Sequence, residues 1–96
     1  MSIVILGGNE RMNHLYIEEC KKFGCKAKVF SHLKGGVKQQ FGSPDLFIVF
    51  TSTVSHKMLE CARCQMKKCC ADMEMCHQSS LAALNAVLKE RCRVKS

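Results

Sequence analysis

The sequence predicts a small α/β domain in which a four-stranded parallel sheet is covered by helices in the order βαβαβαβα, a Rossmann-like or flavodoxin-like arrangement. Short apolar runs alternate along the chain with segments of helical spacing. The most apolar run, within Asp45–Phe50, is typical of a strand buried on both faces. Because helices connect the strands, we expect right-handed crossovers and a single domain over residues 1–96.

The first part of the chain predicts two strands with a helix between them. Ser2–Leu6 is a short apolar run that ends in a glycine turn, so it indicates a strand rather than a signal peptide. Glu10–Phe23 has helical spacing, and we expect Asn9 to cap its start and Gly24 to end it. Lys26–Ser31 alternates polar and apolar residues and predicts the second strand.

The second part predicts two more strands and three helices. Val37–Phe41 is expected to form a short helix, and Asp45–Phe50 the third strand. Val54–Lys68 has a helical pattern, whereas Cys69–Cys76 has a period near two and lies where a fourth strand is needed. A last helix is expected to begin at a serine cap, Ser79 or Ser80, and to bury one apolar face, formed by Leu81, Leu84, Val87 and Leu88.

Composition narrows the choice of partners. The chain is 47% hydrophobic, as expected of a globular domain, and it has no apolar run long enough to cross a membrane. A net charge of +7 favours anionic ligands, although many of the lysines fall on expected solvated helix faces. The absence of an aromatic stacking platform disfavours nucleic acid. Because four strands make a narrow sheet, we expect a homo-oligomer.

Eight cysteines without an export signal indicate reduced thiols in a cytoplasmic protein. Cys61 and Cys64 have a metal-ligand spacing, but residues at i and i+3 of a helix also share a face and can pack in the core. We expect packing roles for Cys20 and Cys61. The candidates for metal binding or redox chemistry are Cys64, Cys69, Cys70 and Cys76.

The four histidines are candidate metal ligands. Ligands of parallel sheets bind beyond the carboxyl ends of the strands, and His32, His56 and His77 each follow a strand. His14 is expected in the second turn of the first helix, above the glycine turn. Singly, each histidine also fits an ordinary exposed loop residue; as a set, they predict a shared site at one edge of the sheet.

Small and polar residues follow the strands and predict a cradle for an anionic ligand. Thr53 or Ser55 would also serve as a plain helix cap. Dinucleotide binding is disfavoured, because the glycine turn lacks the usual phosphate-binding spacing and no acidic residue follows the second strand. Ser55 and His56 do not indicate a nucleophile and base pair, because adjacent residues at a helix start point in different directions and no acidic orienting residue is evident; an enzyme is therefore disfavoured. The cradle residues are Gly7, Gly8, Asn9, Lys34, Gly35, Gly36, Thr51, Ser52, Thr53, Ser55, Ser79 and Ser80.

Four motifs together resemble a small bacterial family, domain of unknown function 2325. They are Gly7-Gly8-Asn9, His32 with Gly35-Gly36, the segment from Thr51 to His56, and Ser79-Ser80-Leu81. The resemblance covers nearly the whole chain and implies a Rossmann-like fold, together with an association with iron or haem. The cysteines between Cys61 and Cys76 depart from the family pattern, so the resemblance implies no role for them.

Two functions follow as hypotheses. The first is a haem or iron-binding sensor or carrier, with His56, His32 or His14 as ligands and Lys34 or Lys57 near the propionates. Its slot would be lined by Met12, Leu33, Val54 and Met58. The alternative is a thiol-based redox, zinc or iron–sulfur protein that uses the cysteines from Cys61 to Cys76.

Overall fold

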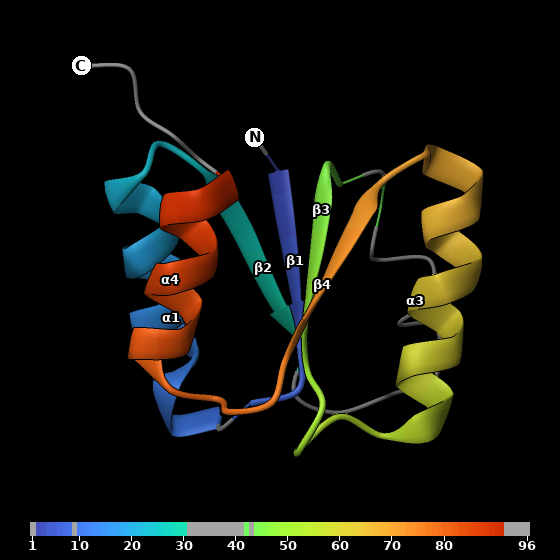
Figure 1. Cartoon of the computed structure of the whole chain (residues 1–96), viewed down its shortest axis with the longest axis horizontal. Coiled ribbons are helices and arrows are strands. Elements are labelled where there is room, and N and C mark those ends of the chain that lie inside the picture. The colour runs from blue at the N-terminus through green and yellow to red at the C-terminus, as the bar shows by residue number, and fades with distance from the viewer. Residues whose placement is uncertain (1, 9, 31–41, 43, 92–96) are drawn as a thin grey trace.

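A computed structural model describes residues 2–8, 10–30, 42 and 44–91 of the chain. Helices cover both faces of a central sheet, with α1 and α4 on one side and α3 on the other (Figure 1). The expected α/β architecture is confirmed. The elements are β1 (Ser2–Leu6), the 3-10 turn η1 (Glu10–Met12), α1 (Asn13–Lys22), β2 (Lys26–Phe30), β3 (Leu46–Phe50), α3 (His56–Cys69), β4 (Asp72–Cys76) and α4 (Leu81–Arg91).

The sheet is parallel throughout and has the strand order β2-β1-β3-β4. The chain places β2 on one side of β1 and then crosses to place β3 on the other side. Parallel sheets bind their ligands at such a switch point, beyond the carboxyl ends of the strands. These ends lie together at the lower edge of Figure 1, and we call this edge the rim.

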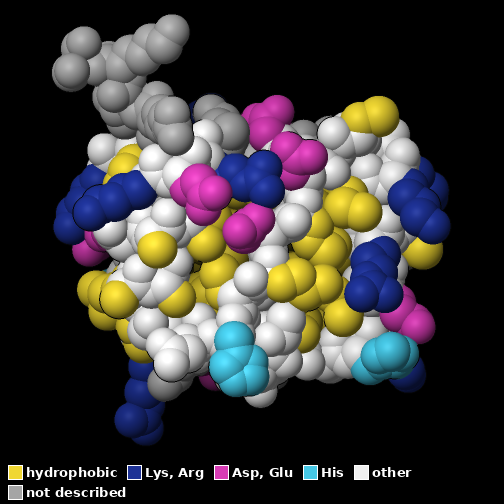
Figure 2. All heavy atoms as spheres, in the orientation of Figure 1, with side chains coloured by type: hydrophobic (Ala, Val, Ile, Leu, Met, Phe, Trp, Pro, Cys, Tyr) yellow, Lys and Arg dark blue, Asp and Glu magenta, His cyan; other side chains and the backbone are white. Residues whose placement is uncertain are grey.

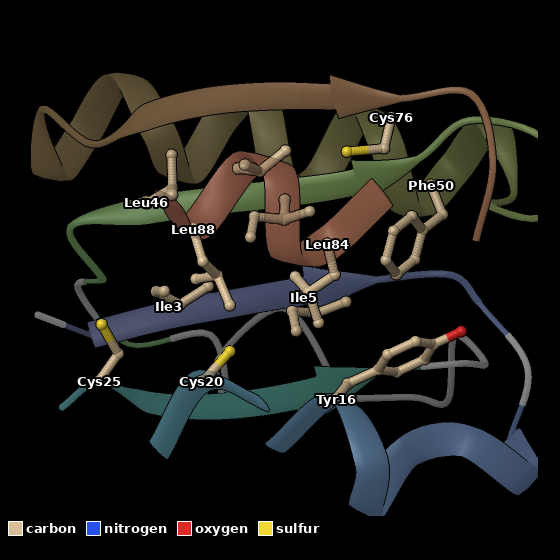
Figure 3. Packing of buried hydrophobic residues seen from close by; sticks show 12 residues of the cluster. Ile3, Ile5, Tyr16, Cys20, Cys25, Leu46, Phe50, Cys76, Leu84 and Leu88 are labelled. Carbon is tan, nitrogen blue, oxygen red and sulfur yellow. The ribbon is translucent and has the colours of Figure 1, made fainter. Parts of the chain in front are cut away.

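The sheet separates two hydrophobic clusters. The first lies beneath α1 and α4 and includes Ile5, Tyr16 and Leu84 (Figure 3). The second lies beneath α3 and includes Leu6, Phe47 and Met58. Every residue of β3 is buried, because alternate side chains enter the two clusters. Full burial of each large apolar side chain stabilises the fold by about 1.5–3 kcal/mol, which makes β3 the most firmly held strand.

Helix α1 begins later than its hydrophobic spacing predicts. Residues 10–12 form η1, and α1 then begins at Asn13 without a side-chain cap. His14 therefore lies in the first turn of α1, not the second. The expected cap Asn9 lies outside the described residues. Gly24 ends the helix as predicted: its φ is +73° and its N–H bonds to the carbonyl of Lys21 at 2.9 Å.

Helix α3 is displaced slightly towards the C-terminus from its predicted range. It begins after Ser55, whose hydroxyl accepts a hydrogen bond from the Met58 N–H at 3.2 Å. Cys70 ends it in the left-handed conformation, with a φ of +57°. Consequently β4 covers only the second part of the range in which a fourth strand was predicted.

Helix α4 begins after Ser80, which is one of the two serines predicted as its cap. The Ser80 hydroxyl accepts a hydrogen bond from the Ala83 N–H at 3.2 Å. Leu84, Val87 and Leu88 are buried, so the predicted apolar face is confirmed. The short helix predicted at Val37–Phe41 lies outside the described residues. None of the described helices has the length and apolar character needed to cross a membrane.

Candidate functional site

The loops after β1 and β3 are joined at the rim by one hydroxyl group. The Gly8 N–H donates a hydrogen bond to Thr53 Oγ1 at 2.6 Å, and this hydroxyl donates in turn to the Phe50 carbonyl at 3.2 Å. The Gly7 N–H donates to the Phe30 carbonyl at 3.0 Å, so the loop after β1 also bonds to the last residue of β2. The structure thus brings together three of the cradle residues predicted from sequence.

The glycine pair permits close packing at this switch point. Gly7 and Gly8 have φ values of +86° and +85°, which favour glycine. A Cβ atom at Gly7 would lie 2.9 Å from Thr53 Oγ1 and 3.1 Å from the Phe50 carbonyl oxygen. A Cβ atom at Gly8 would lie 3.0 Å from the ring of Tyr16. The absence of a Cβ atom at these two positions therefore lets α1 and the loop after β3 pack closely against the turn.

Tyr16 is a rim residue that the sequence identifies only as an apolar position of the first helix. Its buried hydroxyl donates to the carbonyl of Ser79 at 2.6 Å, and its ring lies 5.3 Å from that of Phe50. It therefore connects α1 to the end of β3 and to the loop after β4. A buried tyrosine needs a partner for its hydroxyl. Because the chain has a single tyrosine, the sequence could have indicated that this residue bonds to another part of the fold.

The loops after β3 and β4 are also tied together. The Thr51 N–H donates to the Cys76 carbonyl at 2.8 Å, and the Thr51 hydroxyl donates to the same oxygen at 3.4 Å. Ser55 serves as the cap of α3, while Ser52 is exposed. The polar groups after β3 therefore mostly stabilise the rim itself, and exposed side chains are left to meet a ligand.

His56 is the first residue of α3, directly after these loops. Its side chain is 83% exposed, and its Nε2 lies 3.1 Å from Glu60 Oε1, one helical turn along. His14 and His77 are also exposed. Histidine side chains lie along the lower edge of Figure 2, the same edge as the rim. His32 lies outside the described residues, as do Lys34, Gly35 and Gly36.

No group of three or more His, Cys, Asp or Glu side chains within the described ranges has the geometry to hold a metal ion. The cysteines are distributed over both sides of the sheet. Cys61 and Cys69 pack against the cluster beneath α3, whereas Cys76 belongs to the cluster beneath α1 and α4. Burial raises the pKa of the Cys76 thiol, and the charge of Glu74 raises it further. Cys64 and Cys70 are exposed, and Cys20 is buried as predicted. This distribution does not favour the thiol-based alternative.

The apolar residues proposed to line a haem slot differ in their placement. Met58 is only 1% exposed and belongs to the core, so its predicted place in an open slot is wrong. Met12 and Val54 are half-buried, and Leu33 lies outside the described residues. Exposed apolar surface near the rim comes instead from Met75 of β4, which is 45% exposed. Figure 2 shows hydrophobic side chains on this face, between α4 and α3.

A separate pocket lies at the opposite end of the sheet. It has a volume of about 270 Å³ and includes the start of β1, with Ile3 and Val4. Lys26 and Lys28 of β2 supply positive charge to its wall, and Gly42 and Pro44 complete its lining with Ser2. Its position at the amino ends of the strands separates it from the rim and its histidines.

The family model described as "Uncharacterized protein conserved in bacteria (DUF2325)" matches residues 2–91. No curated protein and no solved structure matches the chain. The matched range contains all the described strands and helices, including the joined loops of the rim. The chain belongs to the DUF2325 family.

Proposed function

We propose that this protein is a small ligand-binding module, a sensor or carrier that binds iron as haem through His56 at the rim of the sheet. The observation that carries the proposal is the presentation of His56. It follows the fully buried strand β3, begins a capped helix, and has an 83% exposed imidazole. A ligating side chain must be held firmly by the fold and still be open to its ligand.

The contact with Glu60 supports a ligating role for His56. One ring nitrogen lies 3.1 Å from a carboxylate oxygen, so the other nitrogen is the one available to a metal. Ligating histidines usually donate their second N–H to such a carboxylate, which fixes the ring and raises its basicity. Bound haem would supply redox or gas-binding chemistry at the iron.

The rim also presents other groups that a haem requires. Lys57 follows it and is exposed, so it is available to a propionate. Val54, half-buried and two residues before His56, provides apolar contact. His77, also exposed, follows β4 and offers a second imidazole. Haem requires this combination of imidazole, cation and apolar surface.

The test is a titration of the purified protein with haem, followed by the Soret absorption band. We expect the wild type to shift the band, and His56→Ala to weaken binding at least tenfold, about 1.4 kcal/mol. His14→Ala is the matched control and should have the smaller effect, because His14 lies on α1 and does not directly follow the buried strand β3. Melting temperatures should change little, since an exposed side chain has few packed contacts.

Two results would count against the proposal. If the wild type gives no Soret shift, haem is not the ligand. If His56→Ala binds haem normally but unfolds several degrees earlier, His56 has a structural role in α3 and the site lies elsewhere.

A further inference from the structure

The outer edge of β4 is open for pairing with another strand. β4 is the last strand in the sheet order and pairs with β3 on its other side. In Figure 1 it lies at the front, and no other described element covers its outer edge. An open edge offers a row of backbone donors and acceptors, and natural proteins cover such edges or block them.

The direction of each backbone group in β4 follows from the hydrogen bonds at its two ends. The Asp72 N–H donates to the Asp45 carbonyl at 3.2 Å, and the Cys76 carbonyl accepts from the Thr51 N–H at 2.8 Å. These residues therefore face β3. Because backbone groups alternate along a strand, those of Met73 and Met75 face the open edge.

The side chains of β4 do not block this edge. Met73 packs against the cluster beneath α3, and Met75, on the same face of the strand, is 45% exposed. On the opposite face Arg91 bonds to Glu74 at 2.8 Å and to Asp72 at 3.4 Å. Neither lysine nor proline, the usual blocking residues, occurs within this strand.

The charge of this edge suits a second copy of the same chain. The whole chain carries a net charge of +7, so two copies repel each other over most of their surface. Along β4, by contrast, Asp72 and Glu74 outnumber the single cation Arg91 that binds them. Acidic side chains gather around a basic one on this face in Figure 2. Repulsion between copies is therefore smallest here.

We propose that two copies of this chain pair through β4, antiparallel, around a twofold axis at Met75. In this register Met75 lies opposite the partner's Met75, and the two residues exchange backbone hydrogen bonds through their outward-facing groups. The two exposed thioethers then cover each other. Glu74 lies opposite the partner's Cys76, whereas a register centred on Glu74 would place two like charges opposite each other.

The test is the molar mass of haem-free protein in solution, measured by sedimentation over a range of concentrations. We expect a dimer for the wild type. Met75→Lys places a charge on the axis and should raise the dimer dissociation constant at least about tenfold while the circular dichroism spectrum is retained. Ala82→Lys adds the same charge at an exposed position of α4 and should leave the dimer intact. A monomeric wild type, or equal dimerisation of Met75→Lys and wild type, overturns the proposal.

A second variant tests strand pairing itself. Met75→Pro removes an N–H that faces the open edge, so the hydrogen bonds between β4 and β3 are preserved. We expect a folded monomer. A folded Met75→Pro protein that dimerises as well as the wild type would exclude strand pairing. Should Met75→Pro fail to fold, the Met75→Lys comparison decides. Because every measurement is made without haem, failure of the proposed haem site and failure of this interface are distinguishable.

Discussion

Substituting Gly7 by alanine tests the close packing of the rim, and Gly24→Ala provides a matched control. Both glycines have positive φ values, +86° and +73°, so alanine meets a similar backbone penalty at each. They differ in their surroundings. A Cβ atom at Gly24 meets nothing within 4 Å, whereas one at Gly7 comes within 3.1 Å of the Phe50 carbonyl oxygen and the Val54 nitrogen.

These surroundings set the expected magnitudes. Gly24→Ala should cost about 1 kcal/mol, because the left-handed conformation disfavours alanine and the loss of unfolded-state entropy offsets part of this. Gly7→Ala carries the same cost and, in addition, about 1–3 kcal/mol for the displacement of packed groups. The backbone atoms cannot yield as a flexible side chain would, and Thr53 Oγ1 is held by two hydrogen bonds. We therefore expect a total of about 2–4 kcal/mol for Gly7→Ala.

Thermal and urea unfolding, followed by far-ultraviolet circular dichroism, measure the difference. Each kcal/mol should lower the melting temperature by about 4–8 °C in a domain of this size. Equal losses for the two variants would show that Gly7 is required only for its backbone conformation. The contact between the loops after β1 and β3 would then contribute little to stability.

Three further changes test other contacts. Tyr16→Phe removes the hydroxyl that bonds to Ser79, and we expect a loss of about 0.5–1.5 kcal/mol in urea unfolding; an unchanged midpoint would show that this bond contributes nothing. The hydrogen bond from Asn85, and secondarily Lys22, lowers the pKa of Glu19, so its ionised form stabilises the fold above the ordinary carboxyl pKa. This contribution is lost as the pH falls through the lowered value, so Glu19→Gln should reduce the acid-induced fall in stability, and an identical pH profile would contradict this. Brief alkylation read by mass spectrometry should label Cys76 more slowly than the exposed Cys64 and Cys70, because Cys76 is buried and its pKa is raised; equal rates would contradict its burial.

The pattern of apolar residues determined the fold class. Leu46–Phe50 is apolar at every position because both of its faces are buried, and a strand of this kind is recognisable without coordinates. Gly24 was also identifiable as a helix end, and the cap of the last helix was narrowed to Ser79 or Ser80, because a C-terminal glycine and an N-terminal serine act through local backbone chemistry. Short-range physics was sufficient in each of these cases.

Local patterns placed helix starts less accurately. Glu10 has the spacing of a helix, yet α1 begins only at Asn13 after η1. Helix α3 begins at His56 instead of Val54, because Ser55 has an extended backbone and its hydroxyl caps the helix by accepting a hydrogen bond from the Met58 N–H. Periodicity does not indicate which carbonyl a terminal N–H will meet, since that depends on the turn that precedes the helix.

The chemistry of the rim depended on contacts between residues distant in sequence. The sequence by itself determined that Gly7, Gly8 and Thr53 follow predicted strands. Only the tertiary structure decided that the Thr53 hydroxyl bonds to the Gly8 N–H across 45 residues, and that Tyr16 reaches Ser79 across 63. It also placed Met58 in the core, exposed Met75 at the edge of β4, and put Cys76 on the opposite side of the sheet from Cys61. A pattern gives the face on which a side chain lies, but its partners are fixed by the packing of the whole sheet and its helices.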